Sequence, residues 1–244
     1  MTNAEEASLK ATPSQFVDDF LREARHLLQP VLNDSGAILY SSVATLAPGR
    51  FYLLGLNPGG DPDERTIGES LAGLPSHAEN DYLDEPWAGY VEGRSPVQQC
   101  VQTLAGWLGV NVREICASNL VFRRTHRAEG IRPNEEELYW PVHKLILNTV
   151  DPDILLVFGV GNPSPCSFLL TLHERTQGQR PRVTFAPDDG RYSLPRTFMT
   201  ALLGRDRRVI AFPHFSYYPL RQRGCTANWV RDLVGIPTDR VRDP

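Results

Sequence analysis

The sequence feature that most constrains the fold is an apolar run at residues 51–56 that stops abruptly at Asn57-Pro58-Gly59-Gly60. A short continuous apolar run is typical of a strand that is buried on both faces of a sheet. The proline and the two glycines that follow indicate a tight turn, because proline fixes one backbone angle and glycine permits unusual ones. In open α/β sheets ligands bind just past the carboxyl ends of strands, so Asn57 stands where a binding site is expected. A plain exit from a strand into a turn is the alternative.

Strands and helices alternate along the rest of the chain. Strands are expected at residues 51–56, 115–122, 154–158 and 208–212, and helices at residues 13–31, 96–108, 133–150, 164–175, 195–203 and 226–234. This alternation predicts an α/β fold with three α/β/α layers around a central, mainly parallel four-stranded sheet. We expect residues 1–12 to be a flexible tail and residues 13–240 to form a single domain, with a long irregular segment from residue 60 to residue 94.

Composition argues against several classes of protein. No apolar run approaches the roughly 20 residues that a membrane-spanning helix needs, and the acidic N-terminus lacks the basic and apolar parts of a signal peptide. We therefore expect a cytoplasmic protein without a membrane partner. The four cysteines are far apart in the sequence, which argues against a disulfide framework or a zinc site. No histidine spacing is typical of a metal site either, so we expect neither a metal nor another cofactor.

Charge is distributed unevenly along the chain, although its net value is only −4. Residues 1–100 carry 6 basic and 15 acidic side chains, a balance of −9. Residues 171–224 carry 10 arginines and 4 acidic side chains, a balance of +6. Such asymmetry can mark a surface that faces phosphate groups, so we expect these arginines around the mouth of the binding site. An ordinary solvated surface is the alternative.

Three polar side chains stand at or near the ends of the expected strands. Asn57 follows the first strand, Asn119 lies within the second, and His214 follows the fourth. Because parallel strands end at the same edge of a sheet, these side chains are expected to converge on one pocket. Two amides and an imidazole can orient a water molecule, read an amide edge and stabilise an anion. Taken singly, each residue could equally have a purely structural role.

Four short motifs follow one another between residues 50 and 235. They are Gly-Leu-Asn-Pro-Gly at 55–59, Ser-Asn-Leu-Val at 118–121, Asp-Pro-Asp-Ile-Leu-Leu-Val-Phe-Gly at 151–159 and Pro-His-Phe-Ser at 213–216. In order and spacing they resemble the uracil-DNA glycosylase superfamily, in the branches whose first motif carries an asparagine. The resemblance implies a monofunctional DNA glycosylase that hydrolyses the N-glycosidic bond of uracil or a related deaminated base in DNA.

The resemblance also implies a role for each matching residue. Asn57 would orient the attacking water through its side-chain oxygen, and His214 would donate a hydrogen bond to uracil O2 as the base departs. Asn119 would read O4 and N3–H, a pattern that cytosine presents in reverse. Leu56 and Tyr82 would complete the base-binding set. The residues implied to contact DNA are Pro58, Gly59, Ser216, Tyr217, Tyr218, Arg221 and Arg223.

The implied partner is DNA that contains a damaged or deaminated base, bound by a monomer. The target base must first leave the stack, and a wedge residue can fill the gap that it leaves. In the family the wedge follows the second motif, where this chain carries Tyr217, Tyr218 and Leu220.

The sequence departs from the family pattern at three places. Phe215 replaces the usual proline after the histidine, which leaves the shape of that motif open. Arg123 and Tyr139 occupy the positions where the iron–sulfur branches carry cysteine ligands, so no cluster is expected. The family's base-stacking aromatic is replaced by Gly60-Asp61, so one of three later aromatics would have to serve, Tyr82, Trp87 or Tyr90.

Two alternatives remain open within this resemblance. One is a catalytically weak nucleic-acid-binding member of the same fold, which the acidic N-terminal half and Phe215 would suit. The other places a covalent bond between DNA and a loop histidine, as in one branch of the family. His126 lies in an arginine-flanked loop and is the candidate for that role.

Overall fold

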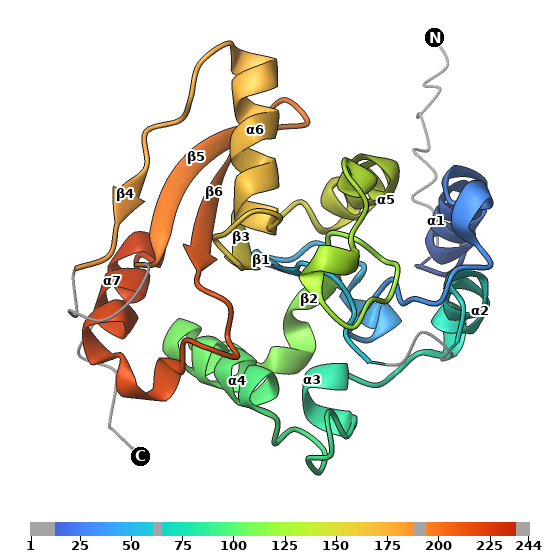
Figure 1. The fold of residues 1–244 in the computed structure, drawn as a ribbon, viewed down its shortest axis with the longest axis horizontal. Helices are drawn as coiled ribbons and strands as arrows, with labels where there is room; N and C mark the ends of the chain where they lie inside the picture. Colours follow the sequence, from blue (N-terminus) through green and yellow to red (C-terminus); the bar gives the residue numbers. More distant parts are fainter. Residues whose placement is uncertain (1–12, 61–64, 188–193, 238–244) are drawn as a thin grey trace, which may run out of the picture.

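The structure is a computed structural model that describes residues 13–60, 65–187 and 194–237 (Figure 1). The predicted tail and residues 238–240 of the predicted domain lie outside these ranges. Six strands form one sheet in the order β2-β1-β3-β6-β5-β4. Their bounds are β1 Phe51–Gly55, β2 Cys116–Asn119, β3 Ile154–Phe158, β4 Thr184–Phe185, β5 Arg196–Leu202 and β6 Arg205–Phe212.

The parallel half of the sheet contains the four predicted strands. These strands pair in parallel in the order β2, β1, β3 and β6. Leu53 of β1 lies between Ala117 of β2 and Leu156 of β3, and Leu156 in turn lies opposite Ile210 of β6. Each of these strands is buried along most of its length, as expected for a sheet covered on both faces.

The prediction of four strands is wrong because β5 and β4 extend the sheet in antiparallel fashion. Residues 195–203, predicted as a helix, contain β5. Its methionine, alanine and leucine favour a helix, but pairing with residues 205–211 of β6 outweighs that preference. Thr197 adds a hydrogen bond from its hydroxyl to Val209 O at 2.7 Å.

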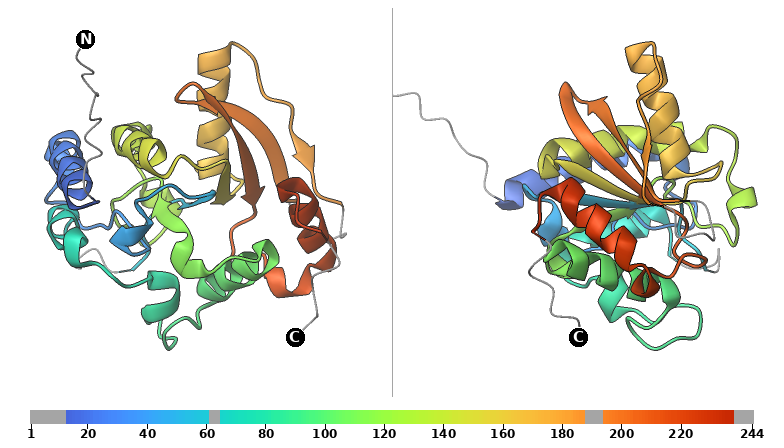
Figure 2. Two further views of the ribbon diagram at one scale, coloured as in Figure 1. Left: turned by 180° about the vertical axis from the view of Figure 1, so that it is seen from behind. Right: turned by 90° about the vertical axis from the view of Figure 1, so that its left-hand side faces the viewer.

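Helices lie on both faces of the sheet (Figure 2). One apolar cluster joins α1, α2, α5 and α6 to the side chains of Tyr52, Leu54 and Val157. The other joins α3, α4 and α7 to Phe51, Leu53 and neighbouring strand residues. The bounds are α1 Pro13–Leu27, α2 Ile67–Gly73, α3 Asp81–Asp84, α4 Pro96–Leu108, α5 Glu135–Val150, α6 Pro165–Gln177 and α7 Gly224–Val234. Within the described ranges no helix is long and apolar enough to cross a membrane.

The segment from residue 60 to residue 94 is more regular than predicted, because it contains α2, a 3₁₀ turn at Leu74–Ser76 and α3. A capping box starts α2, in which Thr66 accepts from the Glu69 amide and the Glu69 side chain accepts from the Thr66 amide. Ser-x-x-Gln does the same for α4 at Ser95. Both are sequence signals of a helix start.

The two edges of the sheet are protected in different ways. Along β2, residues 38–41 run antiparallel to the strand, with a bridge between Leu39 and Ser118. The Tyr40 amide also donates to Ala117 O at 2.9 Å there. At the opposite edge stands β4, which is only 2 residues long.

Candidate active site

Asn57, Asn119 and His214 lie at the carboxyl edge of the parallel strands. Gly55 ends β1 directly opposite Asn119, which ends β2. Phe158 ends β3 opposite Phe212, which ends β6, and His214 follows two residues later. The four strand ends are therefore neighbours in the sheet, as the motif order implied.

The side chain of Asn57 is held in one orientation. Its Nδ2 donates to Pro58 O at 2.8 Å, to Thr125 Oγ1 at 2.8 Å and to Thr125 O at 3.3 Å. The carbonyl oxygens of Pro58 and Thr125 can only accept, and the Thr125 hydroxyl already donates its hydrogen to Arg127 O. The side chain of Asn57 must therefore point its nitrogen, and not its oxygen, at these three acceptors. No hydrogen bond within the described chain reaches Oδ1, which is left as an acceptor for a ligand or water.

Thr125 was not identified from the sequence. It lies 68 residues from Asn57, and its amide donates to Pro58 O at 3.1 Å. Next to it, Arg124 Nη1 donates to Gly59 O at 2.5 Å. The loop after β2 therefore fixes the turn after β1, and only its basic composition marked it in the sequence. His126 in the same loop is exposed.

Gly55 leaves room for the Asn119 side chain. A Cβ at this position would overlap Asn119 Oδ1 and would stand 2.7 Å from Phe158 Cζ, so only glycine fits without movement. Asn119 is only 5% exposed, yet its side-chain amide makes no hydrogen bond within the described part of the chain. A buried amide without a protein partner is suited to binding a polar ligand.

His214 presents a hydrogen-bond donor. The Ser216 amide donates to His214 Nδ1 at 3.2 Å, so the neutral ring carries its proton on Nε2. Burial lowers the pKa of His214 below its ordinary value, which favours this neutral form near pH 7. The ring stands edge-on to Phe158, with centroids 5.7 Å apart, and 5.9 Å from Tyr217.

Phe215 stands where the family that the motifs resemble carries a proline, and its packing explains the aromatic ring. It is 1% exposed and stacks on Phe158 with ring centroids 4.8 Å apart. It also contacts Phe212 at 5.7 Å. Phe158, which the sequence reasoning did not single out, thus links Gly55, His214 and Phe215 across the end of the sheet. Its position as the last apolar residue of the third strand was the available signal.

Two of the predicted contact residues are instead part of the core. Tyr218 is 1% exposed, its hydroxyl lies 3.2 Å from Thr226 Oγ1, and the Arg223 guanidinium covers its ring at 4.6 Å. Tyr82 is 2% exposed and packs against the rings of Tyr40 and Trp87. Neither ring can touch a ligand without rearrangement.

The other predicted contact residues differ in exposure. Tyr217, adjacent to the buried tyrosine, is 79% exposed. Ser216, Arg221 and Gly59 are exposed, Leu56 is half-buried and Pro58 is buried. Of the predicted wedge residues, Tyr217 is therefore the one that can reach a ligand.

The prediction that the arginines of residues 171–224 surround the site is wrong for several of them. Arg205 and Arg207 lie at the start of β6, the end away from the site, where both bind Asp151. Arg175 pairs with Glu137 at 2.6 Å and Arg180 with Glu174 at 2.8 Å. Charges counted along the sequence therefore do not describe one face of the molecule.

No protein-family model matches the chain, and a search of curated proteins found no match. Among the described residues, no group of three or more His, Cys, Asp or Glu side chains is arranged to hold a metal ion. The functional assignment consequently depends on the site geometry and on the sequence motifs.

Proposed function

We propose that this protein is a DNA glycosylase that hydrolyses the N-glycosidic bond of uracil or a related deaminated base. The observation that carries the proposal is the orientation of Asn57, whose nitrogen is held by Thr125 while Oδ1 is left as an acceptor. Asn119 and His214 offer an unpaired amide and an Nε2–H donor at the same sheet edge. Helices on both faces of the sheet are compatible with the α/β/α layers that the resemblance implies.

The chemistry follows from these three groups. Asn57 Oδ1 accepts a hydrogen bond from the water that attacks C1′ of the deoxyribose as the bond to the base N1 breaks. An amide oxygen cannot take the proton outright, so the proton that the water loses passes to bulk solvent while the base leaves as its N1 anion. The rate therefore depends mainly on stabilising that departing anion. His214 Nε2–H donates to O2 of that anion. Asn119 binds O4 through its NH2 and N3–H through its oxygen, which selects uracil over cytosine.

The test is a single-turnover excision assay on single- and double-stranded oligonucleotides that contain uracil, hypoxanthine or xanthine. Asn57→Ala and His214→Ala should each lower the excision rate by about 10²- to 10³-fold, the usual cost of one such hydrogen bond. The exposed residues Asn148 and His26 supply matched controls, since Asn148→Ala and His26→Ala should leave the rate unchanged. Excision that survives the loss of both Asn57 and His214 would place the chemistry elsewhere.

A second candidate function is binding of nucleic acid with little excision, which the buried Phe215 in place of the expected proline favours. Under this reading the protein binds uracil-containing strands but releases no base over many hours. Binding by either function should weaken with salt, because counterions are released from the phosphates. The excision assay distinguishes the two, and Tyr217→Ala should weaken duplex binding more than single-strand binding in both cases.

A further inference from the structure

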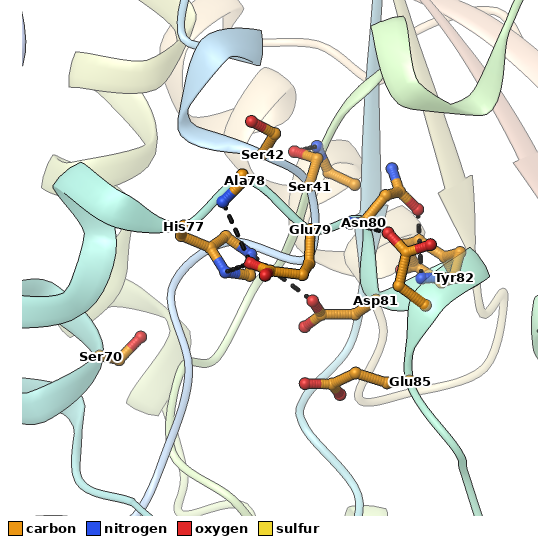
Figure 3. A network of polar contacts seen from close by, with 12 residues as sticks. Ser41, Ser42, Ser70, His77, Ala78, Glu79, Asn80, Asp81, Tyr82 and Glu85 are labelled. Atoms are coloured by element: carbon orange, nitrogen blue, oxygen red, sulfur yellow. Dashed lines mark hydrogen bonds and ion pairs between the residues drawn. The ribbon is translucent and has the colours of Figure 1, made fainter. Parts of the chain in front are cut away.

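Two clusters of charged side chains outside the candidate site have opposite charge. The first is acidic and lies around the start of α3, where His77 stands 3.6 Å from a Glu79 carboxylate oxygen and 3.5 Å from an Asp81 carboxylate oxygen. Figure 3 shows these three side chains pointing toward one another, so the groups of this cluster face partners within the chain. The second cluster is basic and lines a cavity of about 560 Å³. A cavity of this size can hold a small molecule.

The cavity lies beside the outer edge of β5, next to the segment that joins α6 to β4 (Figure 1). None of the described residues that line it is acidic. Its basic lining residues are His173, Arg180, Arg182 and Arg208. Arg208 lies opposite Ile154, the first residue of β3, whereas the candidate site follows Phe158, the last residue of that strand. The cavity is therefore separate from the candidate site.

Two of these arginines have no anionic partner in the part of the chain that the structure describes. Arg180 forms an ion pair with Glu174 at 2.8 Å. Among the described residues, the side chains of Arg182 and Arg208 form neither an ion pair nor a hydrogen bond. Arg208 is also half-buried, and a guanidinium group that loses part of its water without gaining a carboxylate is costly. An anion bound in the cavity would supply the missing partner.

The backbone of β5 adds a hydrogen-bond donor to the cavity. Among the described residues, β4 pairs only with Arg196 and Thr197, so the rest of β5 has no neighbouring strand on this side. The Arg208 amide donates to Asp153 O at 2.9 Å, on the side of β3. An antiparallel residue pair shares either both backbone hydrogen bonds or none, so Met199, which lies opposite Arg208, does not bond to β6. Its amide and carbonyl therefore point to the open edge, where Met199 lines the cavity.

We propose that this cavity binds the phosphate group of a small phosphorylated molecule. Arg182 and Arg208 are its cationic ligands, and the Met199 amide is a neutral donor. Two guanidinium groups carry a combined charge of +2, which matches the charge of about −1.5 to −2 on a phosphate monoester near pH 7. A carboxylate, or one phosphodiester of a nucleic-acid strand, carries only a single charge. The proposal does not rest on the proposed function, because the cavity and the candidate site share no residue.

The methionine in the cavity provides a direct readout. The chain contains only 2 methionines, and Met199 lines the cavity. Isotope-labelled methionine methyl groups therefore report on the cavity with a single NMR signal. Titration of the full-length protein with inorganic phosphate should shift the Met199 signal in a saturable way, whereas acetate at the same ionic strength should leave it in place. A Met199 signal that phosphate does not move, or that both anions move equally, would overturn the proposal.

A matched pair of variants at Met199 tests the charge of the cavity. Met199 and Arg208 are a cross-strand pair, so Met199→Glu places a carboxylate next to the guanidinium, and Met199→Gln has similar bulk without the charge. Calorimetric titration should show phosphate affinity lowered by about tenfold or more in Met199→Glu and changed by less than about twofold in Met199→Gln. Met199 is 42% exposed, so both variants should fold, which thermal unfolding verifies.

A second pair of variants tests the arginine itself. Arg208→Gln should weaken phosphate binding by about tenfold, the usual effect of one charge-assisted hydrogen bond. Arg113→Gln removes an arginine that is paired with Asp84 at 2.6 Å outside the cavity, and it should leave phosphate binding unchanged. Equal affinity in the two Met199 variants, or in the two arginine variants, would contradict the proposal. Displacement of phosphate by a short oligonucleotide without uracil would assign the cavity to nucleic acid and would contradict it as well.

Discussion

Gly55→Ala tests the geometry of the candidate site most directly. The added methyl group would overlap Asn119 Oδ1 and stand 2.7 Å from Phe158 Cζ, which must retreat by about 0.7 Å to reach the ordinary contact limit of 3.4 Å. Both side chains are almost fully buried, so each is forced from its preferred rotamer or displaces a neighbour. Overpacking of this kind costs about 2–3 kcal/mol, from which the lower entropy of the unfolded alanine chain subtracts about 0.5 kcal/mol.

Gly59→Ala is the matched control, four residues further along the same motif. Gly59 has no heavy atom within 4 Å of its added Cβ and is not among the glycines with positive φ. Alanine there should change the free energy of unfolding by less than about 1 kcal/mol. The two variants have the same chemical change four residues apart in one motif, so their difference isolates the contact with Asn119 and Phe158.

Urea unfolding followed by circular dichroism measures both free energies. With an m-value of ~2 kcal/mol/M, Gly55→Ala should lower the urea midpoint by about 1 M relative to wild type. Displacement of Asn119 should also reduce discrimination of uracil from cytosine in oligonucleotide binding. If Gly55→Ala is as stable as Gly59→Ala, Asn119 does not lie over Gly55 and the site described above is incorrect.

Three further outcomes are expected. Leu203→Asn should raise the free energy of unfolding by about 1 kcal/mol, measured as an increase in Tm, because φ is +57° at Leu203 in a two-residue hairpin turn that favours asparagine. Arg207→Met should lower it by about 2 kcal/mol in urea unfolding, because the buried guanidinium binds Asp151 and a backbone carbonyl; an unchanged midpoint would contradict this. Burial lowers the pKa of His143 to about 4, so neutral His143 stabilises the fold above pH 6.5 and this stabilisation is lost as pH falls towards 4. Over this range the free energy of unfolding should fall by about 3 kcal/mol in wild type relative to His143→Gln. Parallel pH profiles for these two proteins would refute that reasoning.

Local sequence patterns predicted the parallel half of the fold because its strands are buried along most of their length. Apolar runs bounded by turn residues mark such strands, and the order of the strands placed Asn57, Asn119 and His214 at one edge. The start of α4 was equally local, because Pro96 stands in its first turn. The prediction of a helix at residues 195–203 failed because strand β5 depends on its partner β6 and not on its own composition.

The parts of the site that were not predicted depend on contacts between distant residues. Thr125 lies far from Asn57 in the sequence, and nothing in its neighbourhood indicates that it fixes the amide. Tyr217 and Tyr218 are adjacent and chemically identical, but the turn after His214 buries one ring and exposes the other. Exposure of single residues in a turn follows from packing, which a strand-and-helix pattern does not contain.

The way in which the sheet ends has a consequence for behaviour at high concentration. An open strand edge is a template on which a second chain can add a strand, and this is a common first step of aggregation. Here residues 38–41 occupy the backbone groups beside β2, and β4 offers only two residues for pairing. Loss of the bridge at Leu39 would therefore expose the backbone N–H and C=O groups at the edge of β2 to other molecules. Insoluble protein during expression, more than lost activity, should be the first sign of damage there.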